Sequence, residues 1–339
     1  MVLVLTEDDV TELLDLEALI PHLADAFVAQ HEGRVERPDR PHYPIGTGRD
    51  PDSKAASGTG LAMPAYIHGA PYAVTKLATV FEGNEARGLP TVTAQILVHD
   101  ADDGQPVALL AGTTITSART GCIGGLAARE LAADPVSLAV FGAGTQARWQ
   151  TRAIAAGTTL ESVVIYSPSD SRLTCARELD GELEASVRAV DSPEAALADA
   201  SVVVTATTST EPVFDGAALE SGALVIAVGA YTDEMRELDD RTIERARWVY
   251  ADVPEEARET GDLRHHEELE IEPFGGLFAA SSAPDADSAG TQSGERPPTN
   301  EAGDVTVCAS VGTAVLDAAT AAFVLEHAPE RGVGRRHHL

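Results

Sequence analysis

A lysine stands in the middle of an apolar run, in the stretch AVTKLATVF at residues 73–81. Of the 24 lysines and arginines in the chain, only Lys54 and Lys76 are lysines. An ammonium group can hydrogen-bond a carboxylate or an imine and can give up its proton, whereas a guanidinium keeps its proton. Lys76 is therefore a candidate for acid–base chemistry. The alternative is an exposed position on a strand edge without a function.

The sharpest local motif is the glycine-rich turn in SLAVFGAGTQARWQ. An apolar run ends at Phe141, two glycines follow, and a helical pattern begins. In dinucleotide-binding turns the first glycine permits the tight turn, the second lets a pyrophosphate approach the backbone, and a small third residue lets the helix pack on the strand. The free N–H groups of the helix N-terminus attract phosphates. The candidate cofactor-binding residues here are Gly142, Gly144, Thr145, Gln146 and Ala147.

The end of the next apolar run indicates which dinucleotide binds. An acidic residue there holds the ribose hydroxyls of NAD, but this chain has Ser167, 25 residues after Gly142. The 2′-phosphate of NADP could be surrounded here by Ser167, Ser169 and Arg172, which favours NADP over NAD. Asp170 lies close enough to keep NAD as an alternative, and a solvated turn without a ligand is a further one.

Two kinds of structure must position these residues. Helical spacing over residues 6–33 predicts one or two helices, residues 37–60 read as a loop or an irregular edge strand, and short β-rich runs joined by a turn at 99–107 complete an α+β region. After Gly112 a helix is followed by strands and helices in alternation. The strands are continuous apolar runs, which is typical of a parallel sheet covered on both faces. A last strand and helix precede a tail that we expect to be mobile.

Charge and composition narrow the function classes. The net charge of −30 is spread along the chain and repels nucleic acid and anionic membranes. With so few lysines, this net charge fits adaptation to a salt-rich cytoplasm, where salt screens the repulsion between carboxylates.

The three cysteines have no metal-binding spacing, which favours reduced thiols in a cytoplasmic protein. The N-terminus resembles neither a signal peptide nor a membrane span. His265 and His266 lie in a charged run that we expect to be a solvated face rather than a metal site.

Five motifs in order along the chain resemble the ornithine cyclodeaminase / mu-crystallin family. The first is K-x-x-x-V-F-x-x-N-x-x-x-G-L-P-T, which begins at Lys76. GTTITSARTG follows at 112–121, GAGTQA at 142–147 and VGAYTDEMRELD at 228–239, and SVGTAVLDAATA begins at Ser310. Together they cover almost the whole chain except residues 279–304, which are rich in Ser, Pro, Gly and Asp and which we expect to form a flexible loop.

The resemblance implies an α/β fold in which a Rossmann domain with a doubly wound parallel sheet is inserted into a discontinuous α+β domain. Residues 1–118 and 312–339 would bind substrate and dimerise, residues 119–311 would bind the dinucleotide, and the active site would lie in the cleft. The resemblance also implies site residues. Lys76, Arg40 and Arg119 would contact the substrate, Thr91, Arg119 and Thr120 would lie near substrate and cofactor phosphates, and Thr207, Val228, Gly229 and Tyr231 would border the nicotinamide.

Two departures from the family pattern bear on the reaction. Cyclodeaminases carry an Asp at the place of Tyr231, and a tyrosine is neutral at pH 7 and a poor base. The family often has an Asp before the glycine of its Arg-Thr motif, where this chain has Ala111, so a local charge partner is expected to be missing. Both departures argue against ornithine cyclisation and leave intact what hydride transfer to an imino acid needs.

The sequence thus predicts a homodimeric NAD(P)-dependent oxidoreductase of small imino or amino acids, with no metal, that uses NADP rather than NAD. It would reduce a ketimine such as 1-pyrroline-2-carboxylate, or interconvert alanine and pyruvate. Arg40 and Arg119 would hold the carboxylate, and Lys76 would polarise the imine and supply a proton. Two alternatives are ornithine cyclodeaminase itself, a lyase that uses NAD without net turnover, and a non-catalytic binder of NADP(H) or a small ligand.

Overall fold

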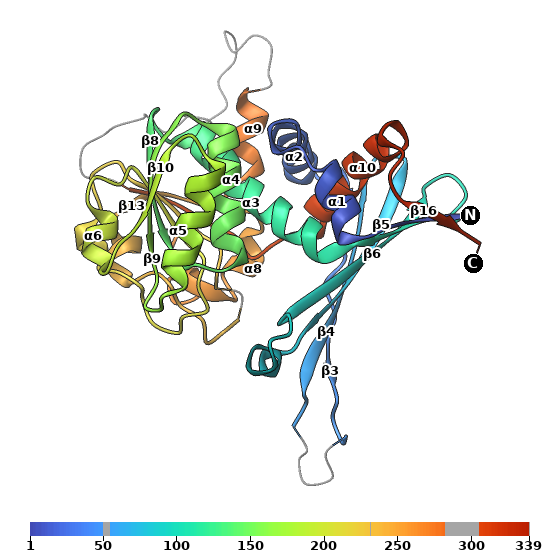
Figure 1. The fold of residues 1–339 in the computed structure, drawn as a ribbon, viewed down its shortest axis with the longest axis horizontal. Coiled ribbons are helices and arrows are strands. Elements are labelled where there is room, and N and C mark those ends of the chain that lie inside the picture. The colour runs from blue at the N-terminus through green and yellow to red at the C-terminus, as the bar shows by residue number, and fades with distance from the viewer. Residues whose placement is uncertain (50–54, 231, 282–304, 339) are drawn as a thin grey trace. The chain divides into compact units, whose positions relative to one another are not determined.

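The computed structural model describes residues 1–49, 55–230, 232–281 and 305–338 (Figure 1). The chain forms two compact units, each described by itself below. The first unit contains Met1–Asp15, Glu32–Arg119 and Ala314–Leu339, and the second contains Leu16–His31 and Thr120–Thr313. The sequence prediction kept residues 1–118 together, whereas helix α2 (Leu16–His31) groups with the second unit because it packs on helices α4 and α9 there.

The first unit is built on a mixed eight-stranded sheet with the order β16-β1-β7-β6-β5-β4-β2, with β3 paired to β4. Among the strands that the structure describes in this sheet, only β1 and β7 are parallel neighbours. The C-terminal tail, which we expected to be mobile, pairs through β16 with the apolar N-terminal run, so that prediction was wrong. The strands are β1 (Val2–Leu5), β2 (Val35–Glu36), β3 (His42–Ile45), β4 (Gly58–Ile67), β5 (Tyr72–Val80), β6 (Val92–Asp100), β7 (Pro106–Ala111) and β16 (Arg335–His337).

Alternation along the strands gives this sheet two different faces. In β5, Val74, Lys76 and Ala78 are buried, while Leu77 on the opposite face is 47% exposed. Helix α10 (Ala314–Arg331) packs against β4 and β5, and α1 (Glu7–Leu13), which begins in a capping box, packs against α10. The predicted turn between β6 and β7 is confirmed, and a 3-10 helix, η1 (Glu82–Arg87), precedes β6.

The second unit holds an eight-stranded sheet in which every neighbouring pair is parallel. Its order is β10-β9-β8-β11-β12-β15-β13-β14, and the first five strands follow the Rossmann order 3-2-1-4-5. The predicted fold class is thereby confirmed. The strands are β8 (Val136–Phe141), β9 (Leu160–Tyr166), β10 (Ser186–Ala189), β11 (Val202–Thr205), β12 (Leu224–Ala227), β13 (Ala246–Ala251), β14 (Glu272–Pro273) and β15 (Val305–Ala309).

Helices connect these strands, and α3 (Gly112–Leu131), the longest helix in the described part of the chain, precedes them. Glycines let α3 approach α4 closely: a Cβ at Gly121 would lie 2.6 Å from the carbonyl oxygen of Trp149, and one at Gly125 would lie 2.6 Å from that of Ala153. The remaining helices are α4 (Thr145–Gly157), α5 (Ser171–Glu182), α6 (Pro193–Leu197), η2 (Gly216–Ala218), α7 (Asp240–Arg245), α8 (Pro254–Ala257), η3 (Gly261–Leu263) and α9 (Gly275–Ser281).

Two further predictions concern a flexible loop and membrane-spanning segments. The flexible loop was predicted over 279–304, but α9 continues to Ser281, and residues 282–304 lie outside the part of the chain that the structure describes. Among the described residues, none of the helices combines the length and the apolar character that crossing a membrane requires.

Candidate functional site

Lys76 lies at the centre of β5 and is only 2% exposed. It therefore does not occupy an exposed strand edge, which was the alternative explanation for this lysine. Its Nζ atom lies 2.6 Å from Oδ2 of Asp317. An isolated ammonium in such a place would be strongly unfavourable, so the burial of Lys76 depends on this carboxylate partner.

Asp317 comes from the first turn of α10, and it also binds Arg119 of α3. The Nε atom of Arg119 donates to Oδ1 of Asp317 at 3.2 Å, and the two side chains are 6% and 0% exposed. A carboxylate in a first turn is further stabilised by the helix dipole. One buried carboxylate thus holds two cationic side chains, both predicted to bind substrate.

The sequence prediction missed Asp317. It noted instead that Ala111 leaves the Arg119 region without a local charge partner. The structure shows a distant partner, which is supplied almost two hundred positions later in the chain. The signal was present: Asp317 is the only charged residue in the apolar run ASVGTAVLDAATAAFVL. Up to Leu325 this helix is apolar on all sides, so a lone carboxylate in that part must have a buried partner.

The environment sets the protonation of Lys76. Burial lowers the pKa of Lys76 to about 8, with Arg119 and Arg40 acting in the same direction, while the charge of Asp317 and its hydrogen bond oppose the shift. Two buried cations share one carboxylate, so the Lys76–Arg119–Asp317 cluster has one positive charge in excess. Such a cluster can accept an anion and, near pH 8, can exchange a proton.

Arg40 lies near this cluster, between β2 and β3. Its side chain is partly exposed, and its charge lowers the pKa of both Lys76 and His42. The structure therefore brings together the three residues for which a substrate-binding role was predicted, and adds Asp317 to them.

In the second unit, the glycine-rich turn has the geometry that its sequence predicts. Gly142 has a φ of +115°, and a Cβ there would lie 2.4 Å from the carbonyl oxygen of Ala206, so only glycine fits. A Cβ at Gly144 would meet nothing within 4 Å, which leaves space in front of the backbone. Gly144 is the N-cap residue of α4 and forms no side-chain cap, Thr145 is exposed and Ala147 is fully buried. Open backbone N–H groups at a helix N-terminus fit a pyrophosphate.

Arg148 stabilises this turn, and the sequence prediction did not include it. Its Nη1 atom donates to the carbonyl oxygens of Ala143 at 2.6 Å and Gly144 at 3.1 Å. Its Nη2 atom forms an ion pair with Glu178 of α5 at 2.6 Å. Arg148 thus occupies the carbonyl oxygens of Ala143 and Gly144 and holds the shape of the turn.

At the end of β9 the candidate 2′-phosphate residues are already engaged. The Nη2 atom of Arg172 lies 2.7 Å from Oδ1 of Asp191, and its Nη1 atom donates to the carbonyl oxygen of Ser169 at 2.8 Å. Asp170 adds a second carboxylate 3.5 Å from the guanidinium. Ser167 is partly buried, and its Oγ is 3.5 Å from Oγ of Ser169. The surroundings of Arg172 are thus rich in negative charge.

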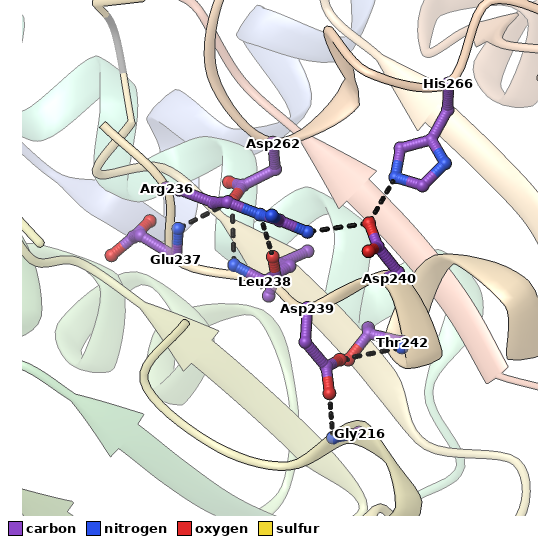
Figure 2. A network of polar contacts seen from close by, with 9 residues as sticks. All are labelled: Gly216, Arg236, Glu237, Leu238, Asp239, Asp240, Thr242, Asp262 and His266. Atoms are coloured by element: carbon purple, nitrogen blue, oxygen red, sulfur yellow. Dashed lines mark hydrogen bonds and ion pairs between the residues drawn. The ribbon is translucent and has the colours of Figure 1, made fainter. Parts of the chain in front are cut away.

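Thr207, Val228 and Gly229 lie just beyond the carboxyl ends of β11 and β12, where doubly wound sheets bind their ligands. The backbone N–H groups of Thr207 and Gly229 both donate to the carboxyl group of Glu237, at 2.6 Å and 2.8 Å. Figure 2 shows the segment around Glu237 and the contacts of its backbone with Asp262. Tyr231, for which a role near the nicotinamide was predicted, lies outside the described residues.

Two of the other predicted cofactor residues, Thr91 and Thr120, accept hydrogen bonds through their carbonyl oxygens. The carbonyl oxygen of Thr91, just before β6 in the first unit, accepts from Phe81 N at 2.8 Å. The carbonyl oxygen of Thr120 in α3 accepts from Nε2 of Gln150 in α4 at 2.8 Å. Gln146, in the first turn of α4, is partly buried.

The structure shows no candidate metal-binding site among the residues that it describes. No group of three or more histidine, cysteine, aspartate or glutamate side chains is arranged to hold an ion there. His266 instead lies 3.4 Å from Asp240 (Figure 2).

A parallel sheet in Rossmann order, with a glycine-rich turn between its first strand and the following helix, defines the dinucleotide-binding class of folds. The comparison with protein families is more specific. Residues 1–332 match the model of the ornithine cyclodeaminase/mu-crystallin family, and the chain belongs to that family. The resemblance seen in the motifs is thereby confirmed.

Individual relatives cover nearly the full length. The chain is 30% identical over 337 residues to a delta(1)-pyrroline-2-carboxylate reductase of Bacillus cereus, covering 98% of this chain and 99% of the relative. The structure of the Thermococcus litoralis delta(1)-pyrroline-2-carboxylate reductase in complex with NADH and L-proline matches with a TM-score of 0.85 at 27% identity, over 99% and 100% of the two chains. An archaeal alanine dehydrogenase dimer with bound NAD matches with a TM-score of 0.85 at 25% identity, over 100% and 99%.

Proposed function

We propose that this protein is an NAD(P)H-dependent reductase of small imino acids, and that 1-pyrroline-2-carboxylate is its substrate. The observation that carries the proposal is the buried Lys76–Arg119–Asp317 cluster, with its excess positive charge and an ammonium that can donate a proton. The same reaction appears in the names of the Bacillus and Thermococcus relatives.

Each group of the cluster has a role in this reaction. The guanidinium groups of Arg119 and Arg40 bind the carboxylate of the imino acid, for which their planar donor pairs are suited. The Lys76 ammonium hydrogen-bonds the imine nitrogen and gives it a proton as the adjacent carbon is reduced. Asp317 keeps Lys76 protonated in a buried place where it would otherwise lose its proton. When bound, the nicotinamide supplies the hydride.

The second unit binds the dinucleotide through the turn at Gly142 and Gly144 and the N-terminus of α4. The sequence favoured NADP, but the geometry supports NAD(H). Arg172 is engaged by Asp191 and faces Asp170 as well, so a 2′-phosphate would meet two carboxylates there. Both solved relatives described above hold NADH or NAD.

The outer face of the sheet in the first unit supports the predicted homodimer. Leu77 and Leu109 are 47% and 39% exposed, and the strand register places both on the face opposite Lys76. Large exposed apolar side chains gathered on one face are typical of a protein interface. The archaeal alanine dehydrogenase relative is a dimer.

Reversible reduction of the imine formed from pyruvate and ammonia is a second candidate reaction. It is favoured by the similarity to the archaeal alanine dehydrogenase, which equals the Thermococcus enzyme in TM-score. The same carboxylate anchors and the same proton donor would serve both substrates. The two reactions share the reduction of a C=N bond beside a carboxylate. They differ because 1-pyrroline-2-carboxylate is a preformed cyclic imine, whereas pyruvate must first condense with ammonia and release water.

The test follows NADH and NADPH absorbance with purified protein in concentrated KCl after addition of 1-pyrroline-2-carboxylate, with Lys76→Ala as the control. We expect the wild type to oxidise NADH faster than NADPH, and the variant to be inactive. A folded wild type that oxidises neither would overturn the reductase assignment. Pyruvate with ammonia is then tried as substrate, and L-ornithine with NAD is examined for proline and ammonia, the products of a cyclodeaminase. Tight cofactor binding without any turnover would identify a binder.

A further inference from the structure

The second unit contains a buried carboxyl group that the proposed chemistry does not use. Glu237 is 0% exposed and lies in the segment between β12 and α7. Its Oε1 accepts from Thr207 N at 2.6 Å, and its Oε2 accepts from Gly229 N at 2.8 Å and from the Thr205 hydroxyl at 2.9 Å. All three partners present hydrogen atoms to it, an arrangement that stabilises the ionised carboxylate.

These three donors lie at the carboxyl edge of the parallel sheet, on the last residue of β11 and on the loops that follow β11 and β12. Thr205 ends β11 and Thr207 follows it, while Gly229 follows β12. The loop after β11 in turn lies against the glycine-rich turn, because a Cβ at Gly142 would meet the carbonyl oxygen of Ala206 at 2.4 Å. One carboxylate therefore ties together the loops that border the expected path of the dinucleotide.

The contact between the loops leaves no spare room. A Cβ at Gly229 would lie 2.5 Å from Oε1 of Glu237 and 2.3 Å from the carbonyl oxygen of Thr207. The backbone of Glu237 is fixed as well, because Oδ1 of Asp262 accepts from the N–H groups of Glu237 and Leu238 at 2.6 Å and 2.7 Å (Figure 2). The position of the carboxyl group is thus set from both sides.

The charges around Glu237 act on its ionisation. Burial and the neighbouring Asp262 of η3 raise the pKa of Glu237 to about 7, while the donors from Thr207 and Thr205 oppose the shift. Arg236, the nearest cation of the same segment, acts on Asp262 and binds Asp240 of α7. Asp240 also pairs with His266.

Protonation of Glu237 would disturb the loops. A neutral carboxyl carries an O–H that needs an acceptor, but the two backbone partners can only donate. The hydroxyl of Thr205 can turn to accept, yet the proton-bearing oxygen then loses its capacity to hold a backbone N–H firmly. One loop would be released from the carboxyl group, and the two loops would no longer be held in register.

We propose that Glu237 is a positioning residue that holds the loops after β11 and β12 in the shape required by the nicotinamide half of the dinucleotide, and that it does so only as a carboxylate. Dinucleotide affinity should then fall on acidification. This inference rests on the proposed binding of a dinucleotide by the second unit, but not on the choice of substrate.

The test is the dissociation constant of NAD⁺, measured by calorimetry between pH 6 and pH 8, a range in which the ligand itself does not titrate. If only the ionised form is competent, affinity at pH 6 should be about tenfold weaker than at pH 8. Glu237→Gln, which cannot ionise, should bind NAD⁺ about tenfold more weakly at pH 8 and show no pH dependence. A pH-independent affinity of the wild type would overturn the inference while leaving dinucleotide binding intact.

Two further variants test whether the pH dependence of NAD⁺ affinity is specific to Glu237. Asp239 lies two residues away and accepts from Thr242 N and Gly216 N, but it holds a helix start rather than these loops. Asp239→Asn should therefore keep the pH dependence. Thr205→Val removes one donor and should move the midpoint of the pH dependence to a higher pH. An unchanged midpoint would contradict the inference, and it remains measurable even if Glu237→Gln does not fold. Absence of NAD⁺ binding at every pH would overturn both proposals together.

Discussion

Two buried carboxyl groups, one in each unit, have the same exposure and opposite surroundings. Asp317 and Glu237 are both 0% exposed. Asp317 holds the charged side chains of Lys76 and Arg119, whereas Glu237 is surrounded by backbone N–H groups and a hydroxyl, with a second carboxyl group nearby. The first carboxylate thus has two full positive charges beside it, and the second has only dipoles.

This difference decides what each group can do. In the first unit the titrating group is the cation, because the pKa of Lys76 is lowered to about 8. In the second unit it is the carboxyl group itself, because the pKa of Glu237 is raised to about 7. A side-chain partner of Asp317 such as Lys76 can exchange a proton with a substrate. The backbone N–H groups that bind Glu237 cannot, so Glu237 can only hold their loops or release them. The first arrangement suits chemistry, and the second suits the positioning of loops.

The largest effect should come from Lys76. Lys76→Met removes the proton donor while retaining an apolar stem, and we expect imino-acid reduction to fall by about 10²- to 10⁴-fold, the usual contribution of general acid catalysis. Lys76→Arg keeps the charge but cannot readily release a proton, so it should be nearly as inactive. Initial rates of NADH oxidation measure both. An active Lys76→Arg variant would show that only the charge matters.

The second largest effect should be on the free energy of unfolding, which Asp317→Asn should lower more than Glu237→Gln does. Asp317→Asn leaves two buried cations without a counter-charge and should lower the free energy of unfolding by about 3–5 kcal/mol. Glu237→Gln disturbs uncharged donors only, and should cost about 1–3 kcal/mol. Urea denaturation in concentrated KCl measures both losses. Equal losses, or a larger loss for Glu237→Gln, would mean that the contrast between charged and backbone partners is unimportant.

A loss of stability smaller than that of Asp317→Asn, and similar to that of Glu237→Gln, is expected from Gly229→Ala. The added Cβ would lie 2.5 Å from Oε1 of Glu237 and should force the loop outward, at a cost of about 1–3 kcal/mol. Gly181→Ala in α5 is the matched control, because a Cβ there meets nothing within 4 Å and alanine favours a helix. Thermal unfolding compares the two, and a harmless Gly229→Ala would show that the loop is not tightly held.

The smallest expected effect is that of salt on the stability loss caused by Asp317→Asn, which should be close to zero. Surface carboxylates repel one another and are screened by salt, whereas a buried pair is screened much less. With a net charge of −30, the melting temperature should rise from 0.2 M to 2 M KCl. The loss caused by Asp317→Asn should nevertheless be the same at both concentrations. A loss that disappears in high salt would place this ion pair effectively in solvent.

The sequence predicted much of the fold and part of the site, for identifiable reasons. Continuous apolar runs and the glycine-rich turn are local signals, so the parallel sheet and the α4 N-terminus could be predicted from them. Lys76 was recognisable because lysine is so rare in this chain. Asp317 was missed because its partners are separated from it by almost two hundred residues or more, and only the fold brings them together.

Other failures have the same origin. Strand β16 was predicted as a mobile tail because a short polar segment such as RRH carries no β pattern, and its strand exists only through pairing with β1. Glu237 stands in an acidic segment, TDEMRELDD, that reads as solvated surface, yet it is buried by contacts with the ends of two strands. Local pattern predicts elements, whereas buried charges depend on long-range pairing.

The most direct test of the account is the pH dependence of kcat/KM for reduction of 1-pyrroline-2-carboxylate by the wild type and by Asp317→Asn. Lys76 must be protonated to act as the acid, so the wild-type value should fall as the pH rises through about 8. Because the charge of Asp317 opposes the lowering of the pKa of Lys76, its removal should move this limb to lower pH, by about 1 unit or more. The substrate's own ionisation is the same in both measurements and cancels. A limb that stays in place in Asp317→Asn would contradict the central claim that Asp317 sets the protonation of Lys76.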